Sequence, residues 1–370
     1  MQPDRITPLI PLLKNSVFDL LILNPGPGML YLTGLHFHLM ERPTLLLVDQ
    51  SGKTAMILPA LEESKVQAQL PGLVCYTYGD NPAAWQGAIN DAFQHFCPKA
   101  NAIGVESARL RHLELSYILG ALPSAIIQSA DTLLSALRIR KDAAEVALIR
   151  QAVAIAEGAF LKTITSIQPG MTERAIASEL TINMLRLGSD AELPFPPIVA
   201  AGPNSADPHA VPSERPIQAG DLIVIDWGAA YQGYFSDLTR TLAVGKLDPE
   251  LYTIYEAGLN ANEAGRSAAK PGIPAGDVDR AGRKIIAAAG YGQFFTHRMG
   301  HGLGMEAHEE PYIYGENEQL LIPGNVFTVE PGIYLPGKGG ARIEDNMLIT
   351  ESGAESISTL ARELITIPCP

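Results

Sequence analysis

Two aspartates lie within residues 222–244, a stretch whose other residues are typical of buried β-strands. Asp226 follows four aliphatic residues, where an unpaired charge would cost several kcal/mol or become protonated. A turn at residues 231–233 would fold the chain into a hairpin and set Asp226 directly opposite Asp237, about 5 Å away. Two like charges at that distance repel each other, so a bridging cation is expected, and a divalent metal ion is the simplest candidate.

A second segment later in the chain repeats this arrangement. Residues 219–228, AGDLIVIDWG, align with residues 323–332, PGNVFTVEPG, so that Asp226 corresponds to Glu330. A glycine-rich turn after Glu330 would place this residue opposite Glu344 across another hairpin. The internal repeat therefore predicts two carboxylate pairs, one in each half.

Three histidines lie between the two predicted hairpins, in the segment THRMGHGLGMEAHEEP. A single histidine is more often structural than functional, and His95 and His112 are interpreted in that way. His297, His301 and His308 differ from them because they are clustered in sequence beside candidate metal-binding carboxylates.

The combined charge of the four carboxylates, −4, bears on the number of metal ions. One divalent cation would leave about two negative charges in a buried site, whereas two cations would neutralise them. Oxygen ligands with one imidazole suit Mn²⁺ first, with Co²⁺ or Zn²⁺ as alternatives. Two bridged metal ions indicate a bridging hydroxide and hence a hydrolase.

These motifs resemble those of the pita-bread metallopeptidases, the family of methionine aminopeptidase, aminopeptidase P and prolidase, with creatinase as a metal-free relative. The resemblance extends over essentially the whole chain and rests on the segments GDLIVIDWG, GYFSDLTRT, GHGLG, VEPGIY and RIEDN. It implies metal ligands at the five matching positions, which are Asp226, Asp237, His301, Glu330 and Glu344.

The resemblance also implies a mechanism, in which a metal-bridging hydroxide attacks the scissile carbonyl and Glu330 carries its proton. His308 and His209 would steady the substrate and the tetrahedral intermediate. Arg342 would brace Glu344 and its neighbourhood. The implied substrate-binding residues are His209, His297, His308 and Arg342.

The residues before the repeat favour one branch of this family. They resemble a creatinase-type N-terminal domain, which methionine aminopeptidases lack, and so indicate the proline-directed enzymes. The first expectation is an Xaa-Pro aminopeptidase, which cleaves the bond before a proline in second position; the alternative is an Xaa-Pro dipeptidase restricted to dipeptides. A non-peptide amide hydrolase and a metal-free binding module on the same fold are further alternatives. The resemblance also implies a homodimer.

The first carboxylate pair also has a purely structural interpretation. Asp226 and Asp237 could cap turns or pair with Arg240, because structural ion pairs also place charges in sheets. The five ligand positions, the histidines and the internal repeat together outweigh this interpretation. Trp227 and Phe235 are expected to be core residues.

Length and charge limit the other classes of function. The chain has 370 residues, enough for two domains with their own cores, and a net charge of −13. Such an acidic protein lacks the basic face that nucleic acid or an anionic membrane would require. No apolar run is long enough to cross a bilayer and residues 1–4 do not begin a signal peptide, so a cytoplasmic protein is expected. The three cysteines show no CxxC pattern and are expected to be reduced thiols.

The order of predicted elements divides the chain. Strands alternating with helices over residues 1–130 predict a small α/β domain of creatinase type, and residues 131–141 are expected to be a linker. Asp142 and Glu145 form a capping-box pattern that predicts the start of a long helix. Residues 142–370 then show two helix pairs, each followed by strands. This pattern predicts a pseudo-symmetric α+β domain of pita-bread type with the carboxylate hairpins at its centre.

Overall fold

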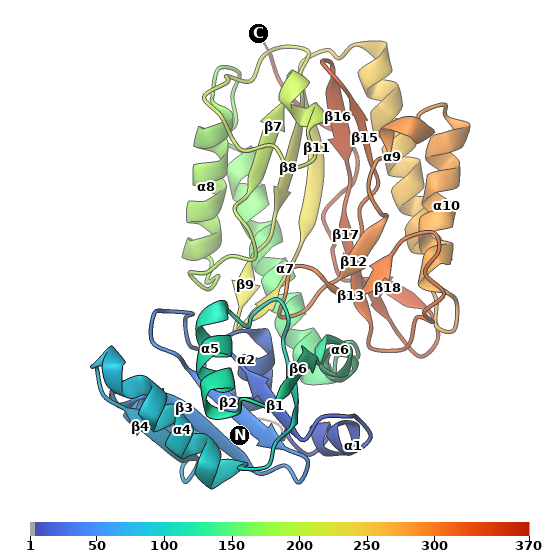
Figure 1. Cartoon of the computed structure of the whole chain (residues 1–370). Coiled ribbons are helices and arrows are strands. Elements are labelled where there is room, and N and C mark those ends of the chain that lie inside the picture. The colour runs from blue at the N-terminus through green and yellow to red at the C-terminus, as the bar shows by residue number, and fades with distance from the viewer. Residues whose placement is uncertain (1–3, 370) are drawn as a thin grey trace. The chain divides into compact units, whose positions relative to one another are not determined.

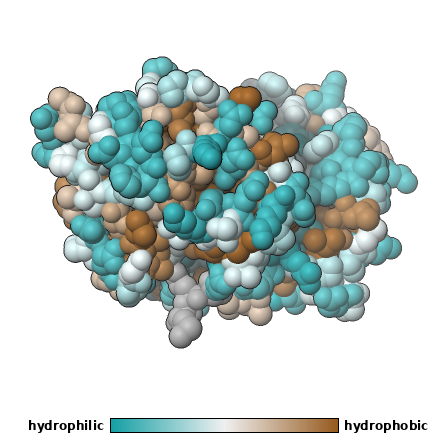
Figure 2. Space-filling model, turned by 60° about the horizontal axis from the view of Figure 1, so that its bottom comes forward, coloured by the Kyte–Doolittle hydropathy of each residue, from teal (hydrophilic) through white to brown (hydrophobic). Residues whose placement is uncertain are grey.

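The chain divides into two compact units, Met1–Arg138 and Ile139–Pro370, of which the computed structural model describes residues 4–369 (Figure 1). Among the described helices, none has both the length and the low charge needed to cross a membrane. Figure 2 shows one face of the molecule, on which hydrophilic side chains predominate and apolar ones are scattered in small groups. All three cysteines are free.

The first unit is a small α/β domain built around one mixed sheet. Its elements are α1 (Leu9–Lys14), β1 (Leu20–Leu23), α2 (Pro27–Thr33), β2 (Leu45–Asp49), β3 (Thr54–Pro59), α3 (Glu63–Gln69), β4 (Val74–Tyr78), α4 (Trp85–Phe96), β5 (Ala102–Val105), α5 (His112–Ala121), β6 (Ile126–Ser129) and α6 (Asp131–Arg138). The strand order is β4-β3-β2-β1-β5-β6. Because side chains alternate across a strand, Leu20 and Ile22 face a core under α4 and α5, whereas Leu21 and Leu23 face a second core under the other helices.

Most of the stretch predicted as a linker, residues 131–141, is helical. Asp131–Arg138 forms α6, whose Leu134 and Leu137 are buried in the second core of the first unit. Their spacing of three residues puts both side chains on one face of a helix, and burial of that face stabilises it. The connection between helices is therefore shorter than the prediction.

The second unit consists of two similar halves, each with a helix pair and strands. The first half contains α7 (Ala143–Ile164), α8 (Glu173–Arg186), β7 (Ile198–Ala201), β8 (Leu222–Trp227), β9 (Ala230–Tyr231), β10 (Tyr234–Phe235) and β11 (Leu238–Val244). The second half contains α9 (Pro249–Ala268), α10 (Ala275–Ala288), β12 (Gly300–Gly302), β13 (Glu309–Ile313), β14 (Val326–Val329), β15 (Gly332–Leu335), β16 (Gly339–Arg342), β17 (Asp345–Ile349), β18 (Ala354–Ser356) and β19 (Ile365–Ile367). The larger sheets run β19-β11-β8-β7 and β13-β12-β14-β17-β18, with short pairs β10-β9 and β15-β16.

Helix α7 begins where the capping box predicts it. The Asp142 side chain accepts from the Glu145 N–H, and the Glu145 carboxylate accepts from the Asp142 N–H, both at 2.9 Å. Helices α7 and α8 pack against the β8–β11 sheet, where the rings of Phe160 and Trp227 stack with centroids 4.6 Å apart. Helices α9 and α10 cover the second half in the same way (Figure 1). The second unit thus has the predicted pseudo-symmetric α+β architecture.

Candidate metal centre

The four predicted carboxylates lie at strand ends where the two halves of the second unit meet. Asp226 is the penultimate residue of β8, and Asp237 comes directly before β11. Glu330 directly follows β14, and Glu344 lies between β16 and β17. A single bridge pairs Thr239 of β11 with Glu344, so the halves touch at this point.

The register of the first hairpin differs from the prediction. Asp226 pairs with Thr239 in the β8–β11 ladder, and not with Asp237. The turn is centred on Gln232 and Gly233, whose φ angles of 51° and 80° are those of a two-residue turn with both central residues left-handed. The prediction centres the turn one residue earlier, since a left-handed conformation is uncommon outside glycine. Asp237 therefore lies diagonally from Asp226.

The register of the second hairpin agrees with the prediction. Gly332 pairs with Arg342, and this register sets Glu330 opposite Glu344. Strands β14 and β17 keep the same register on the other side of the pair. Here the left-handed residue of the turn is Gly337, with a φ of 77°. Because glycine adopts a positive φ without strain, its presence at this position predicts the turn from the sequence.

The side chains of these residues converge with two of the histidines. Nε2 of His301 lies 3.2 Å from Oε1 of Glu330 and 3.7 Å from Oδ2 of Asp237. Potential ligand atoms lie within 4.8 Å of one another in three groups, namely Asp226, Asp237 and Glu344; His301, Glu330 and Glu344; and Asp237, His301 and His308. The structure therefore brings all five predicted metal-ligand positions together, with His308 beside them.

Burial and mutual repulsion dominate the electrostatics of this cluster. Burial, followed by the charges of Glu344, Asp226 and Glu330, raises the pKa of Asp237 well above its ordinary value. Burial and the charges of Glu330 and Asp226 raise the pKa of Glu344 in the same way. Burial also acts upward on Glu330, but the hydrogen bond and charge of His301 outweigh it and lower the pKa of Glu330 to about 2.

These groups fit a divalent cation. Oδ1 of Asp226 is buried without a hydrogen-bond partner, which is costly for a carboxylate oxygen unless a cation meets it. Carboxylate oxygens and one imidazole nitrogen are also donors that Mn²⁺, Co²⁺ and Zn²⁺ accept. The orphaned oxygen and the repelling carboxylates both favour a metal centre here.

We expect metal binding to release protons and to weaken as the pH falls. Without a cation, the raised pKa values of Asp237 and Glu344 keep protons on carboxyls that would otherwise be ionised. A divalent ion must displace these protons, so its affinity decreases as the pH is lowered through the raised pKa values. Calorimetric titration of chelator-treated protein with Mn²⁺, in buffers of different ionisation enthalpy, counts the released protons. Equal affinity at about pH 5 and pH 7 with no proton release would contradict this expectation.

Arg342 contacts Asp226 directly and reaches the expected Glu344 through another side chain. Its Nη2 atom donates to Oδ2 of Asp226 at 2.6 Å, and its Nε atom donates at 3.2 Å to the Thr239 hydroxyl, which in turn donates to Glu344. Arg240, the partner proposed in the structural interpretation of Asp226, instead forms an ion pair with Asp345 at 2.9 Å. Asp226 thus has a cation on one oxygen and an orphaned second oxygen.

Tyr334 is part of the site but is not among the residues predicted from the sequence. Its hydroxyl accepts from Nη1 of Arg342 at 2.8 Å and lies 2.9 Å from Nε2 of His297. Burial, partly offset by Arg342, raises the pKa of Tyr334 to about 12. The signal that could have found it is strand alternation, since Tyr334 is an even number of residues beyond Glu330 in an extended segment.

Two further missed residues hold the ligands in place. The Asn346 side chain accepts from the N–H of Asp237 at 3.2 Å and donates to the carbonyl of the same residue. The Thr239 hydroxyl donates to Oε2 of Glu344 at 2.7 Å. Such partners orient ligands and tune their basicity. The only signal in the sequence is their place within the segments GYFSDLTRT and RIEDN.

His308 stands at the open side of the cluster. Its ring centroid is 4.0 Å from that of His301. Partial burial, followed by the charge of His301, lowers the pKa of His308 to about 4, so the ring is neutral at pH 7. Nη2 of Arg298 lies 3.5 Å from Nδ1 of His308, and its guanidinium group stacks over Tyr312 at 4.3 Å. The neutral imidazole of His308 and the guanidinium cation of Arg298 therefore lie together at the open side of the cluster.

His209 is the least enclosed of the predicted residues. It lies in an exposed part of the segment between β7 and β8. The carbonyl of the preceding Pro208 accepts from Nη1 of Arg342 at 3.3 Å, so this segment reaches the site. His209 also contributes to the low pKa of His308. The structure places it beside the cluster and outside the groups that could hold a metal ion.

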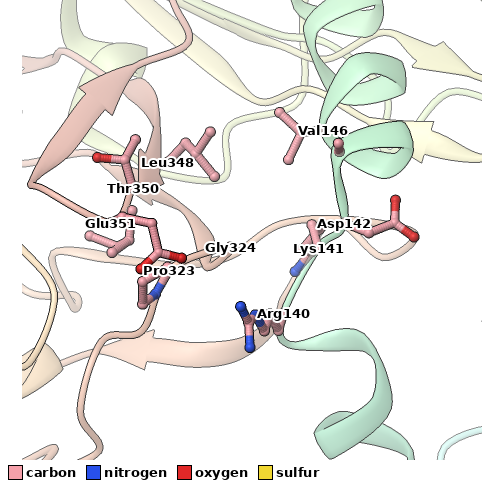
Figure 3. A pocket seen from close by; sticks show the side chains of 11 residues that line it. Arg140, Lys141, Asp142, Val146, Pro323, Gly324, Leu348, Thr350 and Glu351 are labelled. Atoms are coloured by element: carbon pink, nitrogen blue, oxygen red, sulfur yellow. The ribbon is translucent and has the colours of Figure 1, made fainter. Parts of the chain in front are cut away.

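A hollow of about 670 Å³ in the second unit is separate from this cluster (Figure 3). It lies between the start of α7 and the end of β17, and its lining residues include Arg140, Lys141, Asp142, Gly324, Thr350 and Glu351. The Lys141 ammonium group forms a buried ion pair with Glu309 at 2.6 Å. The hollow mixes charges of both signs and contains none of the predicted site residues.

Comparison with known proteins gives matches over both units. Residues 147–351 match the model of metallopeptidase family M24, and residues 5–140 match the creatinase/prolidase N-terminal domain. The probable dipeptidase PepE of Mycobacterium tuberculosis is 37% identical over 354 residues, which cover 94% of this chain and 92% of the relative. The Xaa-Pro dipeptidase of Pyrococcus horikoshii is 34% identical over 365 residues, 98% of this chain and 99% of the relative.

Solved structures show the same likeness. A prolidase from Thermococcus sibiricus superposes with a TM-score of 0.92 at 33% identity, over 99% of this chain and 100% of the other. An X-Pro aminopeptidase from Thermotoga maritima superposes with a TM-score of 0.84 at 30% identity, over 98% of this chain and 100% of the other. Both likenesses extend over nearly the whole chain.

Proposed function

The chain belongs to metallopeptidase family M24, with a creatinase/prolidase N-terminal domain, and we propose that it hydrolyses Xaa-Pro dipeptides. The observation that carries this proposal is the convergence of five carboxylate and imidazole side chains in one buried cluster of a metallopeptidase fold. A metal-free binding module would not need to keep four repelling carboxylates together, because such a cluster destabilises the fold unless a cation compensates it. The metal-dependent enzyme is therefore favoured over the binding module.

The proposed cofactor is a pair of divalent metal ions, with Mn²⁺ first and Co²⁺ or Zn²⁺ as alternatives. The residues that would hold them are Asp226, Asp237, His301, Glu330 and Glu344. Four carboxylates carry −4 when ionised, which two divalent ions neutralise. When bound, the metal ions would make water more acidic and polarise the scissile carbonyl.

The protein's own groups would handle the substrate and the protons. Glu330 is one of the clustered carboxylates and can take a proton from the attacking water. That proton passes to the proline nitrogen as the C–N bond breaks and the new C–O bond is complete. The neutral ring of His308 can donate a hydrogen bond to the substrate carbonyl, and His209 approaches from the neighbouring segment. Arg342 would hold the Asp226 carboxylate in place, and Tyr334 would hold the His297 ring in place.

Dipeptides are proposed as the substrates in place of longer peptides. The first expectation from the sequence is an Xaa-Pro aminopeptidase, but the names of the relatives support the alternative, an Xaa-Pro dipeptidase, better. The Arg298 guanidinium beside His308 supplies a cation on the open side of the cluster. The free carboxylate of a dipeptide's proline could pair with it, whereas the proline of a longer peptide is an amide there.

The proposal is tested by assaying Mn²⁺-loaded protein on an Xaa-Pro dipeptide and an Xaa-Pro-Yaa-Yaa tetrapeptide with the same first residue. We expect kcat/KM to be higher for the dipeptide. A higher value for the tetrapeptide would support the aminopeptidase, and no cleavage of either would reject proline-directed hydrolysis. A homodimer, implied by the family resemblance, is proposed as well and is tested by light scattering.

The Arg298→Ala variant should separate the two substrates. We expect KM for the dipeptide to rise roughly 10- to 100-fold, the value of a charge-assisted hydrogen bond, with KM for the tetrapeptide nearly unchanged. Arg150→Ala is the matched control, since Arg150 forms an exposed ion pair with Glu355. An equal rise for both substrates would mean that Arg298 has no part in recognising the free carboxylate.

A further inference from the structure

The segment that carries His209 has little regular structure of its own. It joins β7 to β8 and contains one short 3₁₀ helix, Gly202–Ala206. Its middle is exposed, with Val211 at 83%. Its backbone is restricted by Pro203, Pro208, Pro212 and Pro216. A stiff, exposed segment of this kind keeps a defined place only if its base is anchored.

Glu173, the first residue of α8, lies at this base and is 0% exposed. Its Oε1 atom accepts from the backbone N–H of Ala201 at 2.7 Å and from the Asn204 amide at 3.0 Å. Its Oε2 atom accepts from the backbone N–H of Ser213 at 3.0 Å and from the Ser213 hydroxyl at 2.6 Å. One carboxylate therefore ties the outgoing end of the segment to its returning end.

The chemistry of these partners is specific for a carboxylate. All of them donate, and a carboxylate accepts through both oxygens. A glutamine would keep one acceptor oxygen, and its NH₂ group would face the donors of either Ala201 or Ser213. Buried donors left without acceptors destabilise that local structure. Glu173→Gln should therefore release one end of the segment while nearly conserving the side-chain volume.

Backbone bonds and an ion pair close the returning end onto the same helix. The N–H of Glu173 donates to the carbonyl of Arg215 at 3.1 Å, and that of Arg174 donates to the carbonyl of Ser213 at 3.0 Å. Arg215 binds both oxygens of Asp221, at 2.7 and 2.9 Å. The base of the segment is thus fixed on α8 and at the entrance to β8.

The anchored segment reaches the candidate metal centre from this base. The Ser205 hydroxyl accepts from the N–H of Gly340 in β16 at 2.8 Å. The Pro208 carbonyl accepts from Arg342, which in turn binds Asp226. Loosening the base would therefore shift His209 relative to the carboxylate cluster.

We propose that Glu173 is a positioning residue, which closes the base of residues 201–215 and so holds His209 at its working distance from the substrate. The first part of this inference is independent of the reaction. The second part rests on the proposed function, because it requires His209 to contact the substrate.

The first part is tested by hydrogen–deuterium exchange on the metal-loaded full chain. We expect Glu173→Gln to speed amide exchange in residues 201–215 roughly tenfold or more, with the core strand β8 unchanged. Ser213→Ala keeps the backbone N–H contact to Glu173 and removes the hydroxyl, which donates to Glu173 and accepts from the N–H of Arg215 at 3.1 Å. It should show a smaller increase and serves if Glu173→Gln fails to fold. Unchanged exchange in this segment in both variants would overturn the inference.

Glu157→Gln is the matched control. Glu157 is another buried carboxylate of the same unit, and it accepts from the N–H of Leu360 at 2.9 Å and from the hydroxyl of Thr359 at 2.6 Å. This variant should loosen residues 357–361 and leave amide exchange in residues 201–215 as in the wild type. Equal loosening of residues 201–215 in both variants would mean a general loss of stability, which contradicts a positioning role.

The second part is tested by a double-mutant cycle with His209→Ala. We expect Glu173→Gln to lower kcat roughly 10- to 100-fold with bound metal unchanged, because small misplacements of a catalytic group are costly. In the His209→Ala background it should lower kcat less than about threefold further, since the group it positions is gone. If the fold losses in kcat of the two single variants multiply in the double variant, Glu173 does not act through His209. If the wild type cleaves no Xaa-Pro peptide, the proposed function fails, while the exchange measurements still decide whether Glu173 anchors the segment.

Discussion

We expect chelation of divalent metal to abolish hydrolysis of Xaa-Pro dipeptides, and we expect Asp237→Asn to do so even when metal is supplied. A metal ion stabilises the transition state by several kcal/mol, and each 1.4 kcal/mol is about a factor of ten, so the loss should be roughly a thousandfold or more. The measurement is kcat/KM together with elemental analysis of the same preparation. Activity that survives exhaustive chelation, or active protein without metal, would end the metal hypothesis.

Although Asp237→Asn should abolish activity, it should stabilise the metal-free protein. The folded-state pKa of Asp237 is raised by burial and repulsion, so its ionised form favours the unfolded chain, and the penalty grows as the pH rises above the unfolded pKa. Asp237→Asn removes this penalty. Its Tm in chelator at neutral pH should therefore exceed that of the wild type, by roughly 2–4 °C per kcal/mol, while the increase of Tm on adding metal should disappear.

Asp345→Asn is the control for neutralising a buried aspartate. Asp345 is paired with Arg240 at 2.9 Å and with Arg362 at 2.7 Å. Burial raises the pKa of Asp345, but the charges of these arginines outweigh it, so the pKa is lowered. Its stabilisation is present above the unfolded pKa, and neutralising it should lower Tm with or without metal. A lower Tm for metal-free Asp237→Asn as well would contradict the claim that the cluster is under repulsion.

His308→Ala should lower kcat roughly 10²- to 10⁴-fold, the range typical of a positioned acid or hydrogen-bond donor, and leave the bound metal almost unchanged. The reason is its position, since its ring packs on His301 at the open side of the cluster and Nη2 of Arg298 lies 3.5 Å from its Nδ1 atom. Single-turnover kinetics with metal analysis separates these two effects.

His301→Ala is the comparison for that experiment, because Nε2 of His301 lies within the carboxylate cluster. This variant should lose metal and activity together. A metal-free His308→Ala protein would show that the division between metal-binding and substrate-binding histidines is wrong. His112→Ala, an exposed histidine of the first unit, should change neither quantity.

Local signals determined which elements form and which residues are drawn together. The capping box of Asp142 starts α7 where expected, because both of its bonds lie within one turn of chain. The second hairpin has the predicted register because a glycine, Gly337, takes the left-handed position in its turn. The internal repeat identified the four carboxylates, and the family resemblance added His301 as the fifth ligand position; the structure brings these five together.

Tertiary structure decided what depends on conformations or partners that the local sequence does not specify. The left-handed Gln232 moves the first hairpin by one residue, and the burial of Leu134 and Leu137 turns most of the predicted linker into helix α6. Arg342 binds Asp226 directly and reaches Glu344 only through Thr239, since a long side chain selects among several acceptors only once the strands have packed. The contacts of Glu173 reach residues 28 and 40 positions away, so they exist only in the folded chain. Short-range patterns thus identify the groups at the site, whereas their register and their supporting contacts depend on packing between segments distant in sequence.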